Sequence, residues 1–306
     1  MADTKLFVQR QPGGLFSVVD KSFCSGTIFY VDSSNAAASD TAGYGRNPDS
    51  PFATIDYAVG KCTASAGDVI FVLPGHTETI IAATSLVCDI AGVKIIGLGE
   101  GSLMPTLTFT TAAAATVSIT AADVTLENLL LLSNYTGGIT AGVTLGASAD
   151  GCHLNGLIFK ETANTKEWLI GVKITADCDD VIIENCKYCG TAGGTTSSII
   201  SALGGTDRSI IKNNYLHGDC SAAAVKLDGA ASADLQVVNN RVINIDAAAG
   251  LGIAMHNSCT GFVAGNYVAN LKDGDAGISG TGVAYCENYC SNALGAQGLL
   301  VPGADS

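Results

Sequence analysis

Hydrophobic and polar residues alternate in a short pattern that the chain repeats. The pattern is clear in SIIKNNYLHG at 209 to 218, and similar stretches are VIIENCKYCG at 181 to 190 and LQVVNNRVIN at 235 to 244. Aligned on Asn213, the copies recur every 22 to 31 residues. Such a period is typical of stacked repeats, in which each unit buries its apolar face against its neighbours. The aligned residues, here called anchor positions, are Gly97, Asn128, Gly156, Asn185, Asn213, Asn239, Gly265 and Glu287.

Each copy predicts three short strands. Apolar residues alternate up to the anchor position, as at Val181 and Ile183, and a second apolar pair follows it, as at Tyr215 and Leu216. Another alternating pair lies upstream of most anchor positions: Val117 and Ile119, Val143 and Leu145, Val172 and Ile174, Val225 and Leu227, Ile253 and Met255. One copy therefore predicts one coil of an all-β parallel β-helix. Coils stacked at about 4.8 Å would build a rod roughly 35 to 40 Å long.

The two ends of the chain differ from the repeat. The sequence predicts a docking arm over 1–27, a parallel β-helix over 28–290 and a tail or cap over 291–306. DSPFATIDYAVGKC predicts a capping helix at about 51–61, with Ser50 at the N-cap and Pro51 at the first helical position. We expect the arm to need a partner surface, because it is apolar without belonging to the repeat. Its apolar residues are Leu6, Phe7, Val8, Leu15, Phe16, Val18 and Val19.

The composition fits one elongated domain with a narrow interior. Hydrophobic residues make up 47% of the 306 residues and aromatic residues only 6%, with 37 glycines. No apolar stretch is long enough for a membrane helix, and the N-terminus lacks the layout of a secretion signal. We therefore expect folding in a cytoplasm, where the eleven cysteines would be reduced thiols. Cys186 and Cys189 would point to opposite faces of a strand, which argues against a metal site, and no cofactor is expected.

Asparagines recur at the anchor position or directly after it. Their amides can bond along the stack and to the turn backbone, so we interpret them as a structural ladder. The ladder residues are Asn128, Asn185, Asn213, Asn239, Asn266 and Asn288, and the adjacent Asn214 and Asn240 belong to the same pattern.

Aspartates form a second row, five or six residues before the anchor positions. One interpretation is a row of carboxylates that holds calcium for a lyase or supplies the acid pair of a glycoside hydrolase. The other is that aspartate caps the same turn in each coil, and recurrence in successive coils favours this structural interpretation. The row consists of Asp123, Asp150, Asp179, Asp180, Asp207 and Asp234.

Residues 28 to 290 resemble the right-handed parallel β-helix proteins of the pectate-lyase-like superfamily. The opening YVDSSNAAASDTAGYGRNPDSPFATIDYAVGKCTASAGDVIFVLPGH is similar to the N-terminal module of a subset that includes structural proteins of tailed bacteriophages. The resemblance implies a single-stranded right-handed solenoid. It leaves function open, because the superfamily holds lyases, hydrolases, esterases, tailspikes and inert virion parts.

The enzymatic members of the superfamily match this chain poorly at their motifs. Pectate-lyase-like catalysis would imply a calcium-binding aspartate cluster with an arginine base, and only Arg208 lies near the aspartate row. The polygalacturonase pattern would imply an Asp pair after Gly and an Arg-Ile-Lys triplet, but the pair Asp179 and Asp180 follows Cys178 and no such triplet occurs. No catalytic site is therefore predicted. The residual candidates are Asp179, Asp180, Asp207 and Arg208.

Ligand binding has little support in the sequence. Glycan-recognising surfaces use aromatic platforms, yet Trp168 is the single tryptophan, and Tyr188 and Tyr215 occupy repeat positions that suit packing. A net charge of −13 opposes binding to nucleic acid. Together with the resemblance to bacteriophage structural proteins, this favours a non-enzymatic bacteriophage virion protein. The resemblance and the rod architecture imply a capsid decoration (cement) protein on the head surface, homotrimeric and bound to the major capsid protein. The alternative is a tailspike or fibre type of glycan-binding or polysaccharide-degrading β-helix protein.

Overall fold

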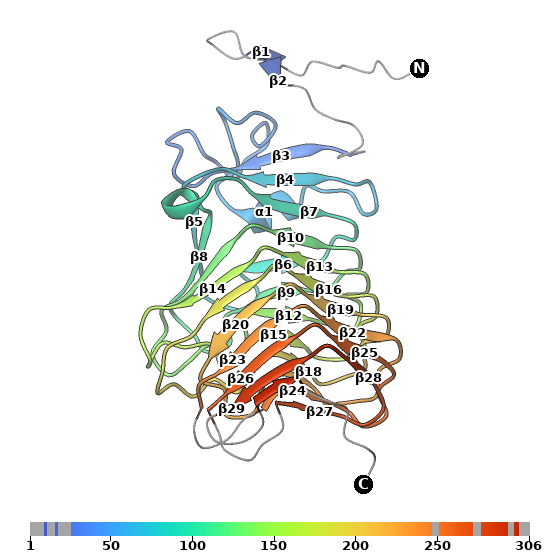
Figure 1. Cartoon of the computed structure of the whole chain (residues 1–306). Coiled ribbons are helices and arrows are strands. Elements are labelled where there is room, and N and C mark those ends of the chain that lie inside the picture. Colours follow the sequence, from blue (N-terminus) through green and yellow to red (C-terminus); the bar gives the residue numbers. More distant parts are fainter. Residues whose placement is uncertain are drawn as a thin grey trace.

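The computed structural model describes residues 9–10, 16–17, 26–246, 251–271, 277–292 and 297–299. The chain winds into a rod of stacked coils whose strands form three parallel sheets (Figure 1). The first coils, with β3 and β4, lie at one end of the rod, and β27 to β29 lie at the other. The fold is the parallel β-helix that the repeat predicted.

Sheet 1 contains the strands that end at the anchor positions, preceded by two strands from before the first anchor position. In chain order they are β3 (Ile28–Val31), β4 (Val69–Val72), β7 (Lys94–Gly97), β10 (Thr125–Glu127), β13 (His153–Asn155), β16 (Ile182–Glu184), β19 (Ile210–Lys212), β22 (Leu235–Val238), β25 (Gly261–Ala264) and β28 (Ala284–Cys286).

Sheet 2 contains the strands that follow the anchor positions. They are β5 (Thr77–Ile80), β8 (Thr106–Phe109), β11 (Leu130–Ser133), β14 (Ile158–Glu161), β17 (Lys187–Cys189), β20 (Tyr215–Gly218), β23 (Arg241–Asn244), β26 (Tyr267–Asn270), β29 (Tyr289–Asn292) and β30 (Gln297–Leu299). The last of these, β30, pairs antiparallel with β29 and so covers its edge.

Sheet 3 contains the upstream strands. They are β6 (Leu86–Cys88), β9 (Val117–Ile119), β12 (Val143–Leu145), β15 (Ile170–Ile174), β18 (Ser198–Ala202), β21 (Ala223–Leu227), β24 (Leu251–Met255) and β27 (Ile278–Ser279). Every upstream pair named from the sequence lies in one of these strands.

The core is built of side chains stacked in columns along the rod. In sheet 1, Leu154, Ile183, Ile211 and Val237 occupy matching positions in successive coils, and each is buried. Strand side chains alternate between the two faces, so a slip of one residue would move a whole column into solvent. The alternation that was visible in the sequence therefore sets the register of the stack.

The turn between sheets 1 and 2 explains the residue types at the anchor positions. All of them except Gly97 have positive φ, between 50° and 65°, which glycine and asparagine adopt most readily. Backbone bonds join them to the next coil, as from the Asn213 N–H to the Val238 oxygen at 3.2 Å and from the Asn239 N–H to the Ala264 oxygen at 2.9 Å. The predicted register of the anchor positions is confirmed.

The asparagine ladder exists, but it lies one residue further along than Asn213 and Asn239. Those two side chains are exposed at the turn. The buried ladder runs from Asn214 through Asn240 to Asn266 and Asn288, each amide bonding to the next at 2.9 to 3.0 Å. Asn128 instead bonds back to the Gly97 and Gly99 oxygens, and Asn185 bonds to the Asn155 side chain. The residue after the anchor points inward, so it can bond from coil to coil out of reach of water.

The predicted helix is shorter than the sequence indicated. Helix α1 spans Ile55–Val59, and Thr54 is its N-cap, so the assignment of Ser50 and Pro51 to its first turn is wrong. The reason is that Phe52 is already paired: its N–H donates to the Tyr30 oxygen, and its own oxygen accepts from Asp32, both at 2.9 Å. Residues Ile55, Ala58 and Val59 are buried, as their spacing predicted. A capping role for α1 stays a prediction.

Other described elements add little to the rod. A short 3₁₀ helix, η1, spans Gly101–Leu103, and β1 (Gln9–Arg10) pairs antiparallel with β2 (Phe16–Ser17). Apart from the backbone of Phe16, the apolar residues of the predicted docking arm lie outside the described residues, as does most of the predicted tail. Within the described ranges, no helix has the length and apolar character to span a membrane.

Candidate functional site

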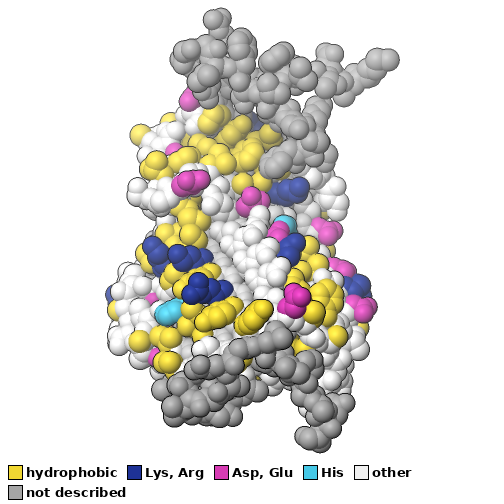
Figure 2. Space-filling view, in the orientation of Figure 1, with side chains coloured by type: hydrophobic (Ala, Val, Ile, Leu, Met, Phe, Trp, Pro, Cys, Tyr) yellow, Lys and Arg dark blue, Asp and Glu magenta, His cyan; other side chains and the backbone are white. Residues whose placement is uncertain are grey.

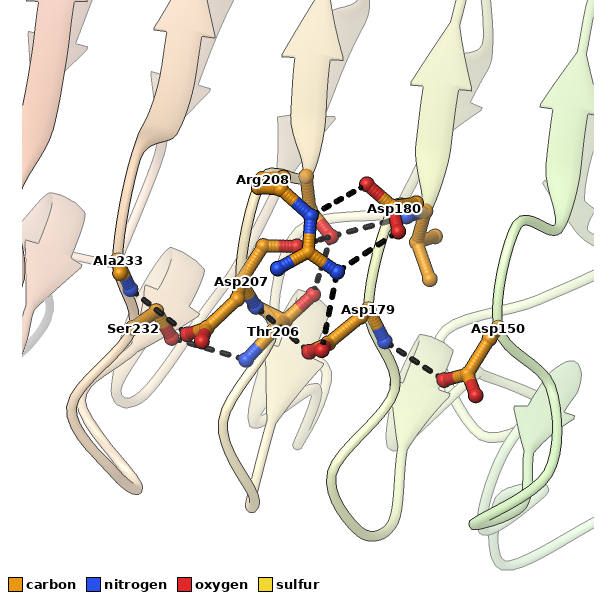
Figure 3. A network of polar contacts seen from close by, with 10 residues as sticks. Asp150, Asp179, Asp180, Thr206, Asp207, Arg208, Ser232 and Ala233 are labelled. Carbon is orange, nitrogen blue, oxygen red and sulfur yellow. Dashed lines mark hydrogen bonds and ion pairs between the residues drawn. The ribbon is translucent and has the colours of Figure 1, made fainter.

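The residual catalytic candidates from the sequence meet in space. Asp180 lies in the turn before β16, and Arg208 lies in the equivalent turn one coil further on (Figure 3). Arg208 donates from Nε to Asp180 Oδ1 and from Nη2 to Asp180 Oδ2, both at 2.8 Å. Its Nη2 also reaches Asp179 Oδ2 at 3.2 Å. Arg208 and Asp180 therefore form a bidentate ion pair between neighbouring coils.

The Arg208 guanidinium keeps Asp180 ionised. Its hydrogen bond to the carboxylate lowers the pKa of Asp180, and the same bond raises the pKa of Arg208. Asp180 is therefore a poor proton donor and Arg208 is a poor base. The pair lies in solvent, where ion pairs contribute little to stability.

Three other carboxylates of this row cap turns. Asp150 accepts from the Asp179 N–H at 2.9 Å, Asp179 accepts from the Asp207 N–H at 3.0 Å, and Asp207 accepts from the Ala233 N–H at 2.7 Å. Each carboxylate thus holds the backbone of the next coil, as Figure 3 shows. These contacts are those expected from the structural interpretation of the aspartate row. A catalytic role for the four candidates stays a prediction.

We predict that Arg208→Ala raises the pKa of Asp180 toward its ordinary value. The folded pKa of Asp180 is depressed, so any stability from the pair is present above the unfolded pKa and lost as pH falls through the folded one. Carboxyl carbon NMR titration measures the change. Lys212→Ala is the matched control, because Lys212 pairs with Glu184 instead. An unchanged Asp180 titration in Arg208→Ala would contradict this account.

A second charged cluster lies on the outward face of sheet 1. Glu184 Oε1 lies 2.8 Å from His153 Nε2, and Glu184 Oε2 lies 3.0 Å from Lys212 Nζ. Burial raises the pKa of Glu184, but the hydrogen bonds from Lys212 and His153 outweigh this effect and leave the pKa below its ordinary value. The sequence analysis missed this cluster, in which Glu184 and Lys212 are register partners and His153 lies in the neighbouring column, opposite Ile182. An ionised carboxylate held between two donors is not a proton donor, so the cluster offers no acid pair.

The outward face of sheet 2 carries cations and aromatic rings in register. Strand pairing places Lys187 opposite Tyr215, Tyr215 opposite Arg241, and Arg241 opposite Tyr267, which is followed by Tyr289. The Arg241 guanidinium lies 5.6 Å from the ring centroids of both Tyr215 and Tyr267. Tyr267 and Tyr289 are 44% and 52% exposed, so the rings are open to a ligand.

A parallel row on the same face carries a lysine, a cysteine and a histidine. Lys160 lies opposite Cys189, and Cys189 lies opposite His217. Figure 2 shows Lys, Arg and His side chains gathered beside hydrophobic ones on the side where β14, β20 and β23 run. We call this surface the cationic aromatic face, and its members are Lys160, Lys187, Tyr215, His217, Arg241, Tyr267 and Tyr289.

The cationic aromatic face is hollowed at its centre. A cavity of about 410 Å³ is lined by Lys187, Cys189, Tyr215 and His217. The outward positions of β14, β17, β20 and β23 contain no acidic residue; they are Ile158, Lys160, Lys187, Cys189, Tyr215, His217, Arg241 and Ile243. A chain with a net charge of −13 therefore presents a positive surface here.

The sequence analysis treated Tyr188 and Tyr215 alike, and this was wrong for Tyr215. Tyr188 is fully buried, and its hydroxyl donates to Glu161 at 2.8 Å. Tyr215 pairs with Lys187 rather than with Tyr188, and so lies on the outward side of its strand. The signal was available, because Tyr215 stands two residues after its anchor position and Tyr188 stands three after its own.

Comparisons with solved structures find the same fold. A lacto-N-biosidase of family GH136 from Eubacterium ramulus matches with a TM-score of 0.60 and 15% identity, over 86% of this chain and 56% of that one. A pectin methylesterase variant in complex with a hexasaccharide matches with a TM-score of 0.50 and 12% identity, over 89% of this chain and 91% of that one. This chain thus spans little more than half the length of the lacto-N-biosidase. No protein-family model matches the sequence, and no curated protein matches it.

These comparisons correct the functional prediction. The matching structures are a glycoside hydrolase and an esterase, so the interpretation as a non-enzymatic virion decoration protein is not upheld. That interpretation relied on the lack of an aromatic platform, and the outward row from Tyr215 to Tyr289 removes this argument. The homotrimer, the capsid partner and the resemblance to phage proteins remain untested predictions. The comparisons and the coordinates together show a parallel β-helix.

Proposed function

We propose that the protein is a polysaccharide-degrading β-helix protein that binds an acidic polysaccharide along the cationic aromatic face. The observation that carries the proposal is the row in which Lys187, Tyr215, Arg241 and Tyr267 follow one another in successive coils. Sugar rings stack on flat aromatic side chains, and Lys and Arg pair with carboxylate or sulfate groups. Because the row follows the rod axis, an extended chain can contact several coils at once.

The fold supports a carbohydrate ligand. The solved structures that share it include a lacto-N-biosidase and a pectin methylesterase bound to a hexasaccharide. The negative charge of the proposed ligand is inferred from the face itself, since its outward positions supply cations and no carboxylate.

The chemistry of the face favours β-elimination over hydrolysis. Glycoside hydrolases use a pair of carboxyl groups, which the outward positions of β14 to β23 lack. Elimination needs a cation at the uronate carboxylate and a base for the adjacent carbon-bound proton. We assign the cation to Lys187 and Arg241 and the base to His217. The glycosidic C–O bond then breaks, and the leaving oxygen takes a proton from the Tyr215 hydroxyl, which gives an unsaturated sugar and a new chain end.

The test combines binding and cleavage on acidic polysaccharides such as polygalacturonate, alginate and hyaluronate. Affinity electrophoresis measures binding, and ultraviolet absorbance measures the unsaturated product. We expect Arg241→Ala to weaken binding roughly 10- to 100-fold, as for loss of a charge-assisted hydrogen bond of about 1.5–3 kcal/mol. His217→Gln should retain binding and lower the elimination rate by about 10²–10⁴-fold.

Two variants outside the face serve as matched controls. Phe262→Ala removes an exposed ring from sheet 1, and Lys173→Ala removes a cation from sheet 3. Neither should change binding or cleavage. Binding without any unsaturated product would show that the protein binds the polysaccharide but does not cleave it by elimination. Loss of binding in Lys173→Ala but not in Arg241→Ala would place the ligand on sheet 3 and overturn the assignment.

A further inference from the structure

Cys189 differs from most cysteines of the chain in its position. It lies at the end of β17 on the outward face of sheet 2 and is half-buried, whereas Cys186, three residues earlier, points into the core. It also lines the cavity of about 410 Å³ at the centre of the cationic aromatic face. A small molecule can therefore reach its sulfur from solvent.

Two lysines and a histidine surround Cys189. Lys160 and His217 are its register partners in the two neighbouring strands, and Lys187 stands two residues earlier on the same face. Glu161 follows Lys160 directly, but its carboxylate is turned away from this face. It accepts hydrogen bonds from the Tyr188 hydroxyl at 2.8 Å and from the Thr191 N–H at 2.7 Å. A negatively charged reagent is thus attracted to the cavity.

Most of the other thiols are protected. Burial raises the pKa of Cys62, Cys152 and Cys186 to about 12 and that of Cys178 to about 11. The thiolate is the reacting form, so these four thiols react slowly, although Cys62 is half-buried like Cys189. Among the described cysteines, Cys286 is the exposed one. It lies at the end of β28 in sheet 1, where its register partner is Ala264 and the next residue is Glu287.

We propose that Cys189 is a covalent modification site for small anionic disulfides. The proposal is independent of the proposed function. The Cys189 thiol loses its proton to solvent, and the resulting thiolate attacks one sulfur of the disulfide. The disulfide bond of the reagent breaks, a mixed disulfide with Cys189 forms, and the second half of the reagent leaves as a thiolate. The two lysines hold the anionic half in the cavity, where the Tyr215 ring packs against it.

The probes are dithionitrobenzoate, an anionic aromatic disulfide, and dithiodipyridine, its neutral counterpart. Both release a coloured thiol, so the rate is followed by absorbance, and peptide mass spectrometry identifies the modified cysteine. All variants carry Cys24→Ser, because Cys24 lies outside the described residues. We expect dithionitrobenzoate to modify Cys189 at least about tenfold faster than Cys286, which is within the usual range of electrostatic rate enhancement. Cys189→Ser should remove this fast phase.

The charge argument has its own control. The double variant Lys160→Gln, Lys187→Gln should slow the reaction of Cys189 with dithionitrobenzoate about five- to tenfold and leave its reaction with dithiodipyridine unchanged. Circular dichroism checks that the fold is retained. The proposal is overturned if Cys286 reacts as fast as Cys189, if the fast phase persists in Cys189→Ser, or if both reagents slow equally in the double variant.

Discussion

Trp168→Ala is expected to lower the free energy of unfolding by about 3–5 kcal/mol, the usual cost of removing a buried large aromatic ring. Trp168 is fully buried, and its ring makes edge contacts with Phe109 at 4.8 Å and Phe159 at 6.0 Å between centroids. Its Nε1 donates to the Lys160 oxygen at 3.1 Å, so alanine also removes a hydrogen bond.

Urea unfolding followed by circular dichroism measures this effect, since fluorescence loses its only tryptophan. The control is Phe262→Ala, which truncates a ring that is 41% exposed and should cost less than about 1 kcal/mol. Equal losses in the two variants would mean that the Trp168 ring does not pack as described.

Asn240→Ala is expected to cost about 2–4 kcal/mol, because it breaks the buried ladder at its centre. Asn240 Oδ1 accepts from the Asn214 N–H at 3.0 Å and from the Asn214 amide at 2.9 Å. Its Nδ2 donates to the Ile211 oxygen at 2.8 Å. Alanine would leave the Asn214 N–H buried without its acceptor, and water cannot reach it.

The matched control is Asn239→Gly, one residue earlier. Asn239 is exposed, and its φ of 54° suits glycine, which holds the same position as Gly265 in the next coil. We expect this variant to stay within about 1 kcal/mol of the parent in the same urea titration. A cost for Asn239→Gly as large as that for Asn240→Ala would show that the turn, and not the ladder, carries the stability.

The proposed elimination and the modification of Cys189 involve the same face of sheet 2, but they can fail separately. The first fails if Arg241→Ala leaves polysaccharide binding intact, and the second fails if Cys286 reacts as fast as Cys189. Lys187 takes part in both, so its variants are interpreted only together with the Arg241 and Cys189 variants.

The sequence by itself determined the coil. The alternation around residues such as Ile183 and Ile211 required one face inward, and the glycine or asparagine at most anchor positions favoured a left-handed turn. These are local effects of backbone sterics and side-chain alternation, so they can be predicted without knowing what lies next to each strand. The extent of α1 could not be predicted in this way, because the backbone pairing of Phe52 with Tyr30 competes with the helix.

Only the tertiary structure decided which side chains of different coils meet. Lys187, Tyr215 and Arg241 are separated by 26 to 28 residues in sequence, and they form one row because the strands stack in register. Neighbours along the rod depend on loop lengths that vary from coil to coil, and a shift of one residue would exchange the inward and outward sets. The composition of the cationic aromatic face, and with it the candidate function, therefore arises from stacking, whereas the repeat arises from the chain alone.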